Sequence, residues 1–298
     1  MELDPSTPLL GRLQESVPQF LRPVEFRVVQ TLQELKTALG LVYWEYLKRN
    51  YTQPNPACLK LSMYHALPTT ITFVALHRSS RVLGTISLIV DSPLGLPMDE
   101  VYKLELDRLR KQGLILAEAG LLALDTELFG QGIFTMFHAK KLLLTLRLFK
   151  VMFDYLRART NTDELVACFN PKHEILYDFL QLKPLGGLKS YTAANGNPAV
   201  ARHLDVAETQ RRATSHIAYQ LFYGATPSSR AFSHKLILSP EDLHELFVGA
   251  SNIFASASPT ELAHIRSCYP QYAFDQILHR AGPPAPNVEL PRADHRAS

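Results

Sequence analysis

Glu118 is the leading candidate in this sequence for a side chain that takes part in a reaction. It lies within an apolar run from Leu114 to Asp125, and the lack of alternation predicts a central strand that is covered on both faces. A carboxylate in such a strand is costly to bury unless it has a partner or faces a cleft. Gly120 has no side chain to pack and indicates a bulge, or the close approach of a ligand or another backbone. The pattern predicts either a general base beside exposed backbone amides or a paired structural carboxylate.

Glu105 is the second candidate acid. It falls within a helix expected from Met98 to Gln112. Val101, Tyr102 and Leu109 stand at the i−4, i−3 and i+4 positions, so its carboxylate should lie on the apolar side of the helix. We expect a second buried acid here and take it as the reserve candidate for the base.

A glycine pair precedes the longest expected helix, which runs from about Phe134 to Arg157. The residues Gly130, Gln131 and Gly132 form a Gly-x-Gly turn. Backbone amides at the start of a helix can cradle a phosphate group. We therefore predict that this loop binds the phosphate of a substrate or cofactor.

The same helix carries a basic stripe, with three cations at i, i+7 and i+10 and a fourth beside them. Its members are Lys140, Lys141, Arg147 and Lys150. Such a stripe is either a solvated face or a docking surface for an acidic protein.

Composition narrows the functional classes. The net charge of +3 comes without a basic run interleaved with aromatic residues, so nucleic acid is not an expected partner. The three cysteines are widely separated and the eleven histidines form no HxxxH or HxH pair, so we predict neither a disulfide framework nor a metal site. The N-terminus lacks a secretory signal, and the apolar stretch from 142 to 156 is too short and too charged to span a bilayer. A cytoplasmic protein is the expectation.

The expected elements alternate as in a mixed α/β layer structure. The strands are predicted at 25–29, 69–76, 81–91, 114–125, 164–169 and 188–192, and the helices at 31–49, 98–112, 134–157 and 172–180. This arrangement divides the chain into a leader at 1–22, a core domain at 23–204, a helical extension at 205–280 and a disordered tail at 281–298. In the extension, Ser239 and Ser258 each precede a proline and stand three residues before an acid, which predicts two capped helix starts.

Two segments of the core resemble a known family. The first runs from Asp91-Ser92-Pro93-Leu94-Gly95-Leu96-Pro97 through Glu105 to Leu116-Ala117-Glu118-Ala119, and the second is Cys168-Phe169-Asn170-Pro171-Lys172-His173-Glu174-Ile175-Leu176-Tyr177. Both are similar to FeeM-type long-chain N-acyl amino acid synthases, relatives of the GNAT acetyltransferases and of acyl-homoserine lactone synthases. The likeness covers roughly residues 24 to 205.

The resemblance implies a GNAT-like mixed central sheet flanked by helices. It also implies transfer of a fatty acyl group from acyl carrier protein to the α-amine of an amino acid. No tightly bound cofactor is implied, because acyl-phosphopantetheine is a co-substrate. Its thioester would meet the backbone amides of Ala119, Gly120 and Leu121 where the fourth strand splays from the fifth.

Roles for side chains follow from the same resemblance. Glu118, or Glu105 in reserve, would accept the proton of the amine, and Tyr177 would either protonate the leaving thiolate or only pack. The basic stripe would dock the carrier protein. Glu127 departs from the acetyltransferase pattern, in which glutamine or arginine is usual, and its charge opposes a pyrophosphate. This favours a carrier protein, whose arm has a single phosphodiester, over coenzyme A.

Two other functions stay open. One is an acyl-CoA-dependent N-acetyltransferase acting on another amine, and the other is a non-catalytic module that binds acyl groups or carrier proteins. Peripheral contact with a lipid product is expected, without a transmembrane segment.

Overall fold

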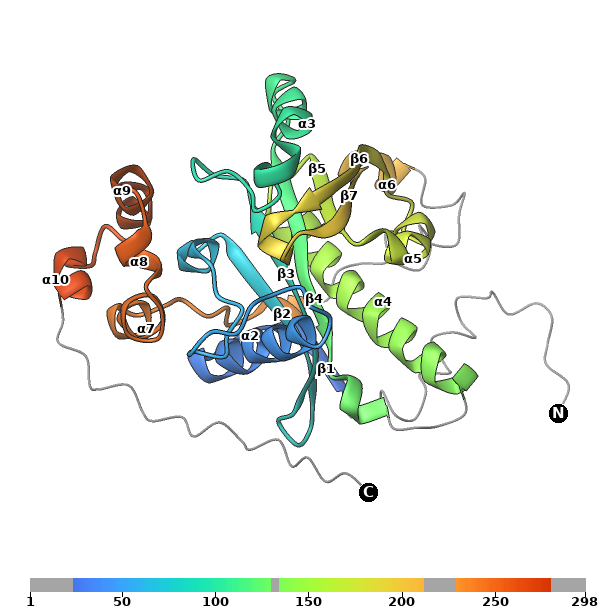
Figure 1. Cartoon of the computed structure of the whole chain (residues 1–298), viewed down its shortest axis with the longest axis horizontal. Helices are drawn as coiled ribbons and strands as arrows, with labels where there is room; N and C mark the ends of the chain where they lie inside the picture. The colour runs from blue at the N-terminus through green and yellow to red at the C-terminus, as the bar shows by residue number, and fades with distance from the viewer. Residues whose placement is uncertain (1–23, 130–133, 212–228, 280–298) are drawn as a thin grey trace, which may run out of the picture. The chain divides into compact units, whose positions relative to one another are not determined.

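The computed structural model describes residues 24–129, 134–211 and 229–279. The contacts divide the chain into two compact units, Met1–Ile237 and Leu238–Ser298, which are described separately. Figure 1 shows the elements of both.

The first unit is built on a seven-stranded sheet of order β1-β2-β3-β4-β5-β7-β6. Every neighbouring pair is antiparallel except β4 and β5, which are parallel. The strands are β1 (Val24–Val28), β2 (Thr70–His77), β3 (Val82–Val90), β4 (Leu116–Leu124), β5 (Glu164–Phe169), β6 (Lys183–Tyr191) and β7 (Asn197–Asp205). The predicted mixed α/β sheet is confirmed, but β7 had been missed.

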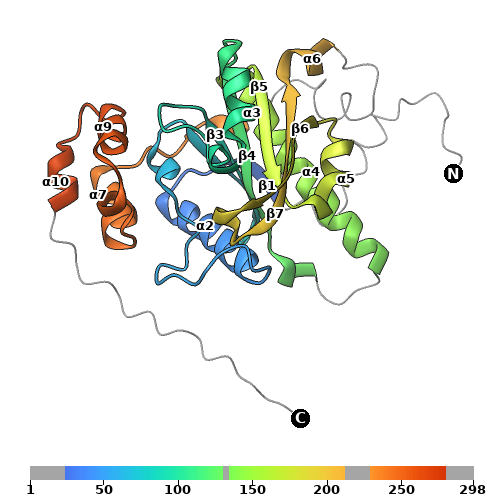
Figure 2. The same cartoon turned by 45° about the horizontal axis from the view of Figure 1, so that its top comes forward.

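Helices cover both faces of this sheet. They are α2 (Leu32–Leu47), α3 (Asp99–Lys111), α4 (Phe134–Arg159), α5 (Glu174–Phe179) and α6 (Val206–Arg211). Figures 1 and 2 show α2 and α3 on one side of the sheet and α4 and α5 on the other. Ala117 and Ala119 of β4 pack with α4, whereas Leu116 packs with α3. Side chains alternate along a strand, so Glu118 points to the side of α2 and α3.

The centre of the sheet opens between β4 and β5. The two strands pair only from Leu116 to Ala119, opposite 164–167, and β4 then continues to Leu124 without that partner. On the other edge of β4, Gly120 lies opposite Ser87, and Ala123 lies opposite Thr85. Two residues of β4 therefore face a single residue of β3, which defines a β-bulge. The bulge and the splay lie at the same level of the sheet.

The segment after β7 belongs to the first unit by its contacts. The helix α6 packs on β7, and a 3₁₀ turn, η7 (Ser229–Phe232), packs on β1. The sequence placed the start of the helical extension at residue 205, whereas the contacts place the division after Ile237. The leader at 1–22 and the tail at 281–298 lie outside the described residues.

The second unit consists of short helices with a core of their own. They are α7 (Pro240–His244), the π-helix η8 (Glu245–Gly249), α8 (Ile253–Ser256), α9 (Pro259–Ser267) and α10 (Phe274–His279). Ser239 and Ser258 both form capping boxes, which confirms the two predicted helix starts. The ring of Phe254 lies 4.9 Å from that of Phe247 and 5.6 Å from that of Phe274.

In the described parts of both units, every helix is too short or too polar to cross a membrane.

Candidate active site

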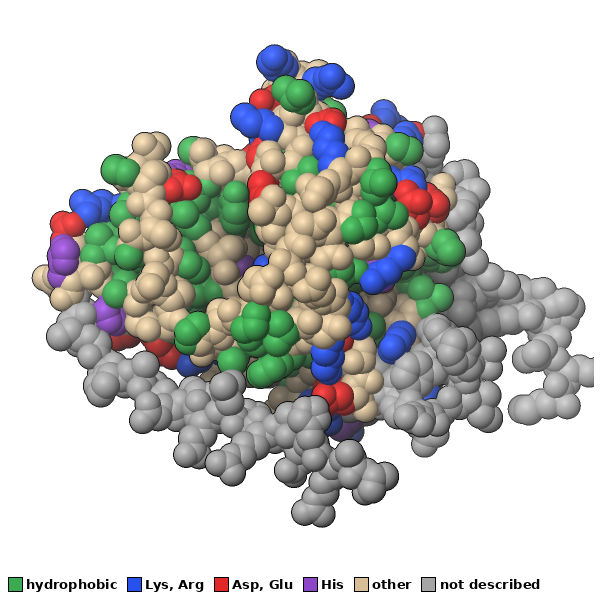
Figure 3. All heavy atoms as spheres, in the orientation of Figure 1, with side chains coloured by type: hydrophobic (Ala, Val, Ile, Leu, Met, Phe, Trp, Pro, Cys, Tyr) green, Lys and Arg blue, Asp and Glu red, His purple; other side chains and the backbone are tan. Residues whose placement is uncertain are grey.

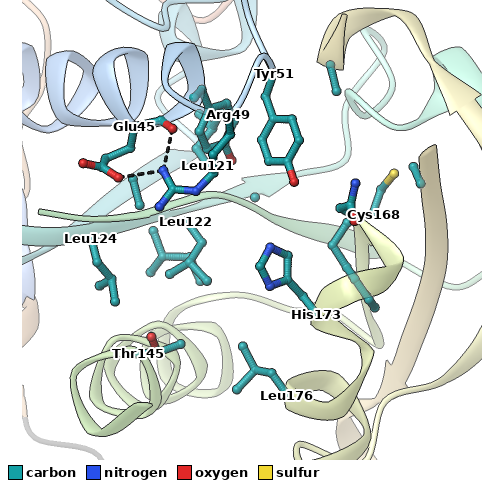
Figure 4. A pocket seen from close by; sticks show the side chains of 18 of the residues that line it. Glu45, Arg49, Tyr51, Leu121, Leu122, Leu124, Thr145, Cys168, His173 and Leu176 are labelled. Carbon is teal, nitrogen blue, oxygen red and sulfur yellow. Dashed lines mark hydrogen bonds and ion pairs between the residues drawn. The ribbon is translucent and has the colours of Figure 1, made fainter. Parts of the chain in front are cut away.

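A cavity of about 490 Å³ occupies the opening between β4 and β5. Its walls come from the end of α2 and the residues after it, the bulged half of β4, α4, the start of α5 and the β6–β7 turn. Figure 4 shows side chains from these elements converging on the cavity. The volume lies in the range of small-molecule sites. Because the cavity occupies the gap in the sheet, it is lined by elements from both faces.

Glu118 lies beside this cavity and is 5% exposed. Its Oε2 accepts a hydrogen bond of 2.9 Å from the backbone amide of Met98, and no cation in the described chain forms an ion pair with it. Burial raises the pKa of Glu118 to about 8, although the hydrogen bond from Met98 opposes the shift. The charge of Glu118 also acts on Cys168 and Tyr191, which line the cavity. A carboxyl with such a pKa can alternate between acid and base near neutral pH.

The bulge lies one residue beyond the predicted position. Leu121, and not Gly120, takes the left-handed conformation, with φ of +53°. That conformation is uncommon for a residue with a side chain and often marks a functional site. A Cβ atom added to Gly120 would lie 3.8 Å from Oε1 of Glu118. Gly120 therefore leaves the space beside the carboxylate open, and Ala119, Gly120 and Leu121 all line the cavity.

Glu105 is placed differently from Glu118. Its Oε1 accepts a hydrogen bond of 2.7 Å from Nζ of Lys189, whose cation lies 4.5 Å from the ring centre of Tyr102. Burial alone would raise the pKa of Glu105, but the hydrogen bond and charge of Lys189 outweigh it and lower the pKa. Neither Glu105 nor Glu118 is among the residues that line the cavity, but Ala119 and Gly120, which follow Glu118 along β4, are. The reserve role of Glu105 stays a prediction, and the geometry favours Glu118.

Tyr177 and Cys168 both line the cavity. The ring of Tyr177 stacks on that of Phe169 with centroids 3.5 Å apart. Burial raises the pKa of the Tyr177 hydroxyl, which keeps it protonated at neutral pH but makes it a weaker acid. Burial also raises the pKa of the Cys168 thiol well above its usual range, so Cys168 is not a thiolate nucleophile at neutral pH.

The residues of the predicted phosphate loop, Gly130, Gln131 and Gly132, lie outside the described residues. Glu127, the acid ahead of the loop, is described. Glu127 lies 3.2 Å from Nζ of Lys48, which also approaches the buried Glu45. The cation of Lys48 thus offsets part of the negative charge at the start of this loop.

The basic stripe does not behave as one surface. Lys150 pairs with Asp154, and the guanidinium of Arg147 lies 5.7 Å from the ring centre of Phe26. Lys141 lines the cavity, and burial lowers its pKa. In the face drawn in Figure 3, Lys and Arg side chains gather between α2 and α4.

A group of polar residues after α2 had not been expected at the site. Glu45, Arg49 and Tyr51 line the cavity, together with His173. Burial would raise the pKa of Glu45, but hydrogen bonds, first of all from Arg49, lower it, so Glu45 is not a second candidate base. The sequence predicted a helix over 31–49, but nothing in the local pattern showed that its end faces β4.

The site is thus the opening of a mixed sheet whose fourth and fifth strands splay beside a bulge, with the buried carboxyl of Glu118 next to it. The family model of the N-acyl amino acid synthase FeeM matches residues 37–205. The chain therefore belongs to the FeeM family of N-acyl amino acid synthases and is an acyltransferase.

The chain is also similar to several solved structures. FeeM, an N-acyl amino acid synthase from uncultured soil microbes, is 28% identical, with a TM-score of 0.54 over 66% of this chain and 98% of that chain. The acyl-homoserine lactone synthase LasI is 14% identical, with a TM-score of 0.46 over 61% of this chain and 88% of that chain. A chimeric spermidine N-acetyltransferase SpeG from Vibrio cholerae is 13% identical, with a TM-score of 0.38 over 62% of this chain and 97% of that chain. No curated protein matches the sequence significantly.

Proposed function

We propose that this enzyme transfers a long-chain fatty acyl group from acyl carrier protein to the α-amine of an amino acid. The observation that carries the proposal is Glu118, a buried carboxyl without a cationic partner in the described chain, with a pKa raised to about 8, beside the opening of the sheet. An idle buried carboxyl is costly. A role in removing a proton from the attacking amine would explain why this carboxyl is buried despite that cost.

The proposed reaction gives each of these groups one role. The phosphopantetheine arm enters between β4 and β5, and the thioester oxygen accepts hydrogen bonds from backbone amides at the bulge, at Ala119 to Leu121. The neutral amine attacks the carbonyl carbon after Glu118 has taken its proton, directly or through one water. The C–N bond forms, the nitrogen loses its second proton as the C–S bond breaks, and the leaving thiolate takes up one proton, which reaches it directly, through Tyr177 or through solvent.

Charge and the apolar lining support a long-chain donor on a carrier protein. Glu127 disfavours a pyrophosphate, although Lys48 offsets part of its charge. The cations Lys140, Lys141 and Arg147 of α4 suit an acidic carrier protein even though they do not form one continuous surface. The cavity walls include several leucines, which suit an acyl chain: Leu121, Leu122, Leu124, Leu142 and Leu176. No tightly bound cofactor is needed, because the acyl-phosphopantetheine thioester is consumed as a co-substrate.

Mass spectrometry of lipid extracts from cells that express the protein tests this proposal. N-acyl amino acids should accumulate with the wild-type chain and not with Glu118→Gln. Short acyl amides of another amine would instead identify a CoA-dependent transferase. Unchanged extracts from cells that contain folded protein would indicate a binding module and contradict the proposal.

A further inference from the structure

Arg49 presents an unused hydrogen-bonding edge at the cavity. Its Nη1 donates to the backbone oxygen of Glu45 at 2.5 Å and to Oε2 of Glu45 at 2.6 Å. Among the described residues, its Nε and Nη2 have no partner. Figure 4 shows the guanidinium at the cavity, with Glu45 on one side of it. The Nε–Nη2 edge of an arginine offers two parallel donors, the geometry that matches a carboxylate or a phosphate.

Tyr51 adds an unsatisfied donor to the same wall. Its hydroxyl is buried and has no hydrogen-bond partner in the described structure, although the residue lines the cavity. The ring is held edge-on by Tyr46, with centroids 5.7 Å apart, and Lys172 lies 5.0 Å from its centre. Burying a hydroxyl without a partner is unfavourable, so this hydroxyl is suited to a ligand atom.

The backbone between these two residues is fixed at both ends. The amides of Asn50 and Tyr51 donate to the carbonyls of Leu47 and Tyr46 at 3.0 and 2.8 Å, and Asn50 has φ of +58°. This is the Schellman pattern that ends a helix. Asn197 of the β6–β7 turn donates to the carbonyl of Asn50 at 2.6 Å. The pattern and the turn hold Arg49 and Tyr51 in position before any ligand binds.

The charge of Arg49 is only partly neutralised. Glu45 is shared among Arg49, Lys48 and Thr126. Lys141 and His173 line the same cavity, and the charge of Arg49 adds to burial in lowering the pKa of each. The cavity wall therefore favours an anion.

We propose that Arg49 and Tyr51 bind the α-carboxylate of the acceptor amino acid; the assignment rests on the proposed acyl transfer. Arg49 and Tyr51 line the same cavity as Gly120, and a Cβ atom added to Gly120 would lie 3.8 Å from Oε1 of Glu118. The α-carboxylate is attached to the carbon that bears the amine, so a clamp near Glu118 suits it. The phosphate of the donor lies at the far end of the pantetheine arm from the thioester, which makes it the less suitable anion here.

The test compares an amino acid with its own α-carboxamide as acceptor, using acyl carrier protein as donor. Arg49→Gln should lower kcat/KM for the amino acid by roughly 10- to 100-fold and leave the carboxamide within a few-fold, as expected for one charged hydrogen-bonded contact. Arg49→Lys, which keeps the charge and the pairing with Glu45, should give an intermediate ratio. Both acceptors are used with every variant, so the difference in amine pKa between them cancels in the comparison.

Arg81→Gln is the matched control. Arg81 is also a partly exposed arginine paired with one acid, Asp125, but it does not line the cavity. It should leave the ratio of the two acceptors unchanged. Thermal unfolding of each variant identifies losses caused by misfolding, and Arg49→Lys carries the test if Arg49→Gln does not fold.

Equal losses for both acceptors, or none for either, would overturn the carboxylate assignment. A variant that instead loses discrimination between acyl-phosphopantetheine and acyl-pantetheine donors would assign Arg49 to the donor phosphate and also overturn it. If the wild-type protein acylates no amino acid at all, the proposed function fails; an unchanged ratio in an active enzyme refutes only the carboxylate clamp.

Discussion

Replacing Glu118 by glutamine should separate the chemistry of this carboxyl from its cost to the fold. Glutamine keeps the size of the side chain and an oxygen that can accept the hydrogen bond from Met98. It removes the basicity, so kcat should fall by roughly 10²- to 10⁴-fold. Raising the pH should partly rescue the variant, because more of the amine is then already neutral.

The stability change should have the opposite sign from that of a broken ion pair. Burial raises the pKa of Glu118 from 4.5 to about 8, so between these values the folded state binds more protons than the unfolded state. The wild-type protein therefore loses stability as the pH rises through this window, whereas the glutamine variant does not. Integrating the shift makes the variant more stable by about 3 kcal/mol at pH 7. Below pH 4 the two proteins should differ little.

Thermal unfolding at several pH values and a pH–rate profile on the same proteins check both parts. In the wild type, kcat/KM should rise with pH through an inflection near 8, where Glu118 loses its proton. The variant should show only the titration of the amine. Glu105→Gln provides the comparison, since Glu105 pairs with the partly exposed Lys189 and should lose up to about 1 kcal/mol of stability with turnover retained.

A Glu118→Gln variant that melts earlier than the wild type at pH 8 and turns over normally while folded would refute this reasoning. The carboxyl would then be a structural group, and the base would be Glu105 or water.

Two further predictions concern the donor and the second unit. Charge reversal at Lys140 and Arg147 should raise KM for acyl carrier protein and weaken the salt dependence of that KM, while a small thioester donor is unaffected. Lys150 is left in place because it pairs with Asp154. Equal losses with both donors would argue against docking. A chain that ends at Ile237 should keep a cooperative thermal transition, because the aromatic residues of the second unit pack on one another. Aggregation of that chain would count against folding of the first unit without the second.

The part of the site that the sequence could predict is the part set by local pattern. The apolar run around Glu118 places a carboxyl within a buried strand whatever its neighbours are. The serines that start α7 and α9 act through their own next three residues. Both features depend on contacts close along the chain, so they can be read without a tertiary structure.

The features that were missed depend on distant partners. The bulge lies at Leu121 because of its register against β3, which the composition of β4 does not show. The strand β7 contains Pro198 near its start, and a proline weakens any strand prediction. Arg49 reaches the active site only because α2 ends against β4, an arrangement set by the folding of the sheet.

Reconstitution with purified protein is the decisive test of the proposed acyl transfer. The protein is incubated with a long-chain acyl group on acyl carrier protein and a mixture of amino acids, and the products are followed by tandem mass spectrometry and by release of the carrier thiol. We expect an amide-linked N-acyl amino acid, formed in step with the thiol and faster than with the matching acyl-CoA. Folded protein that forms no such amide with either donor would contradict it.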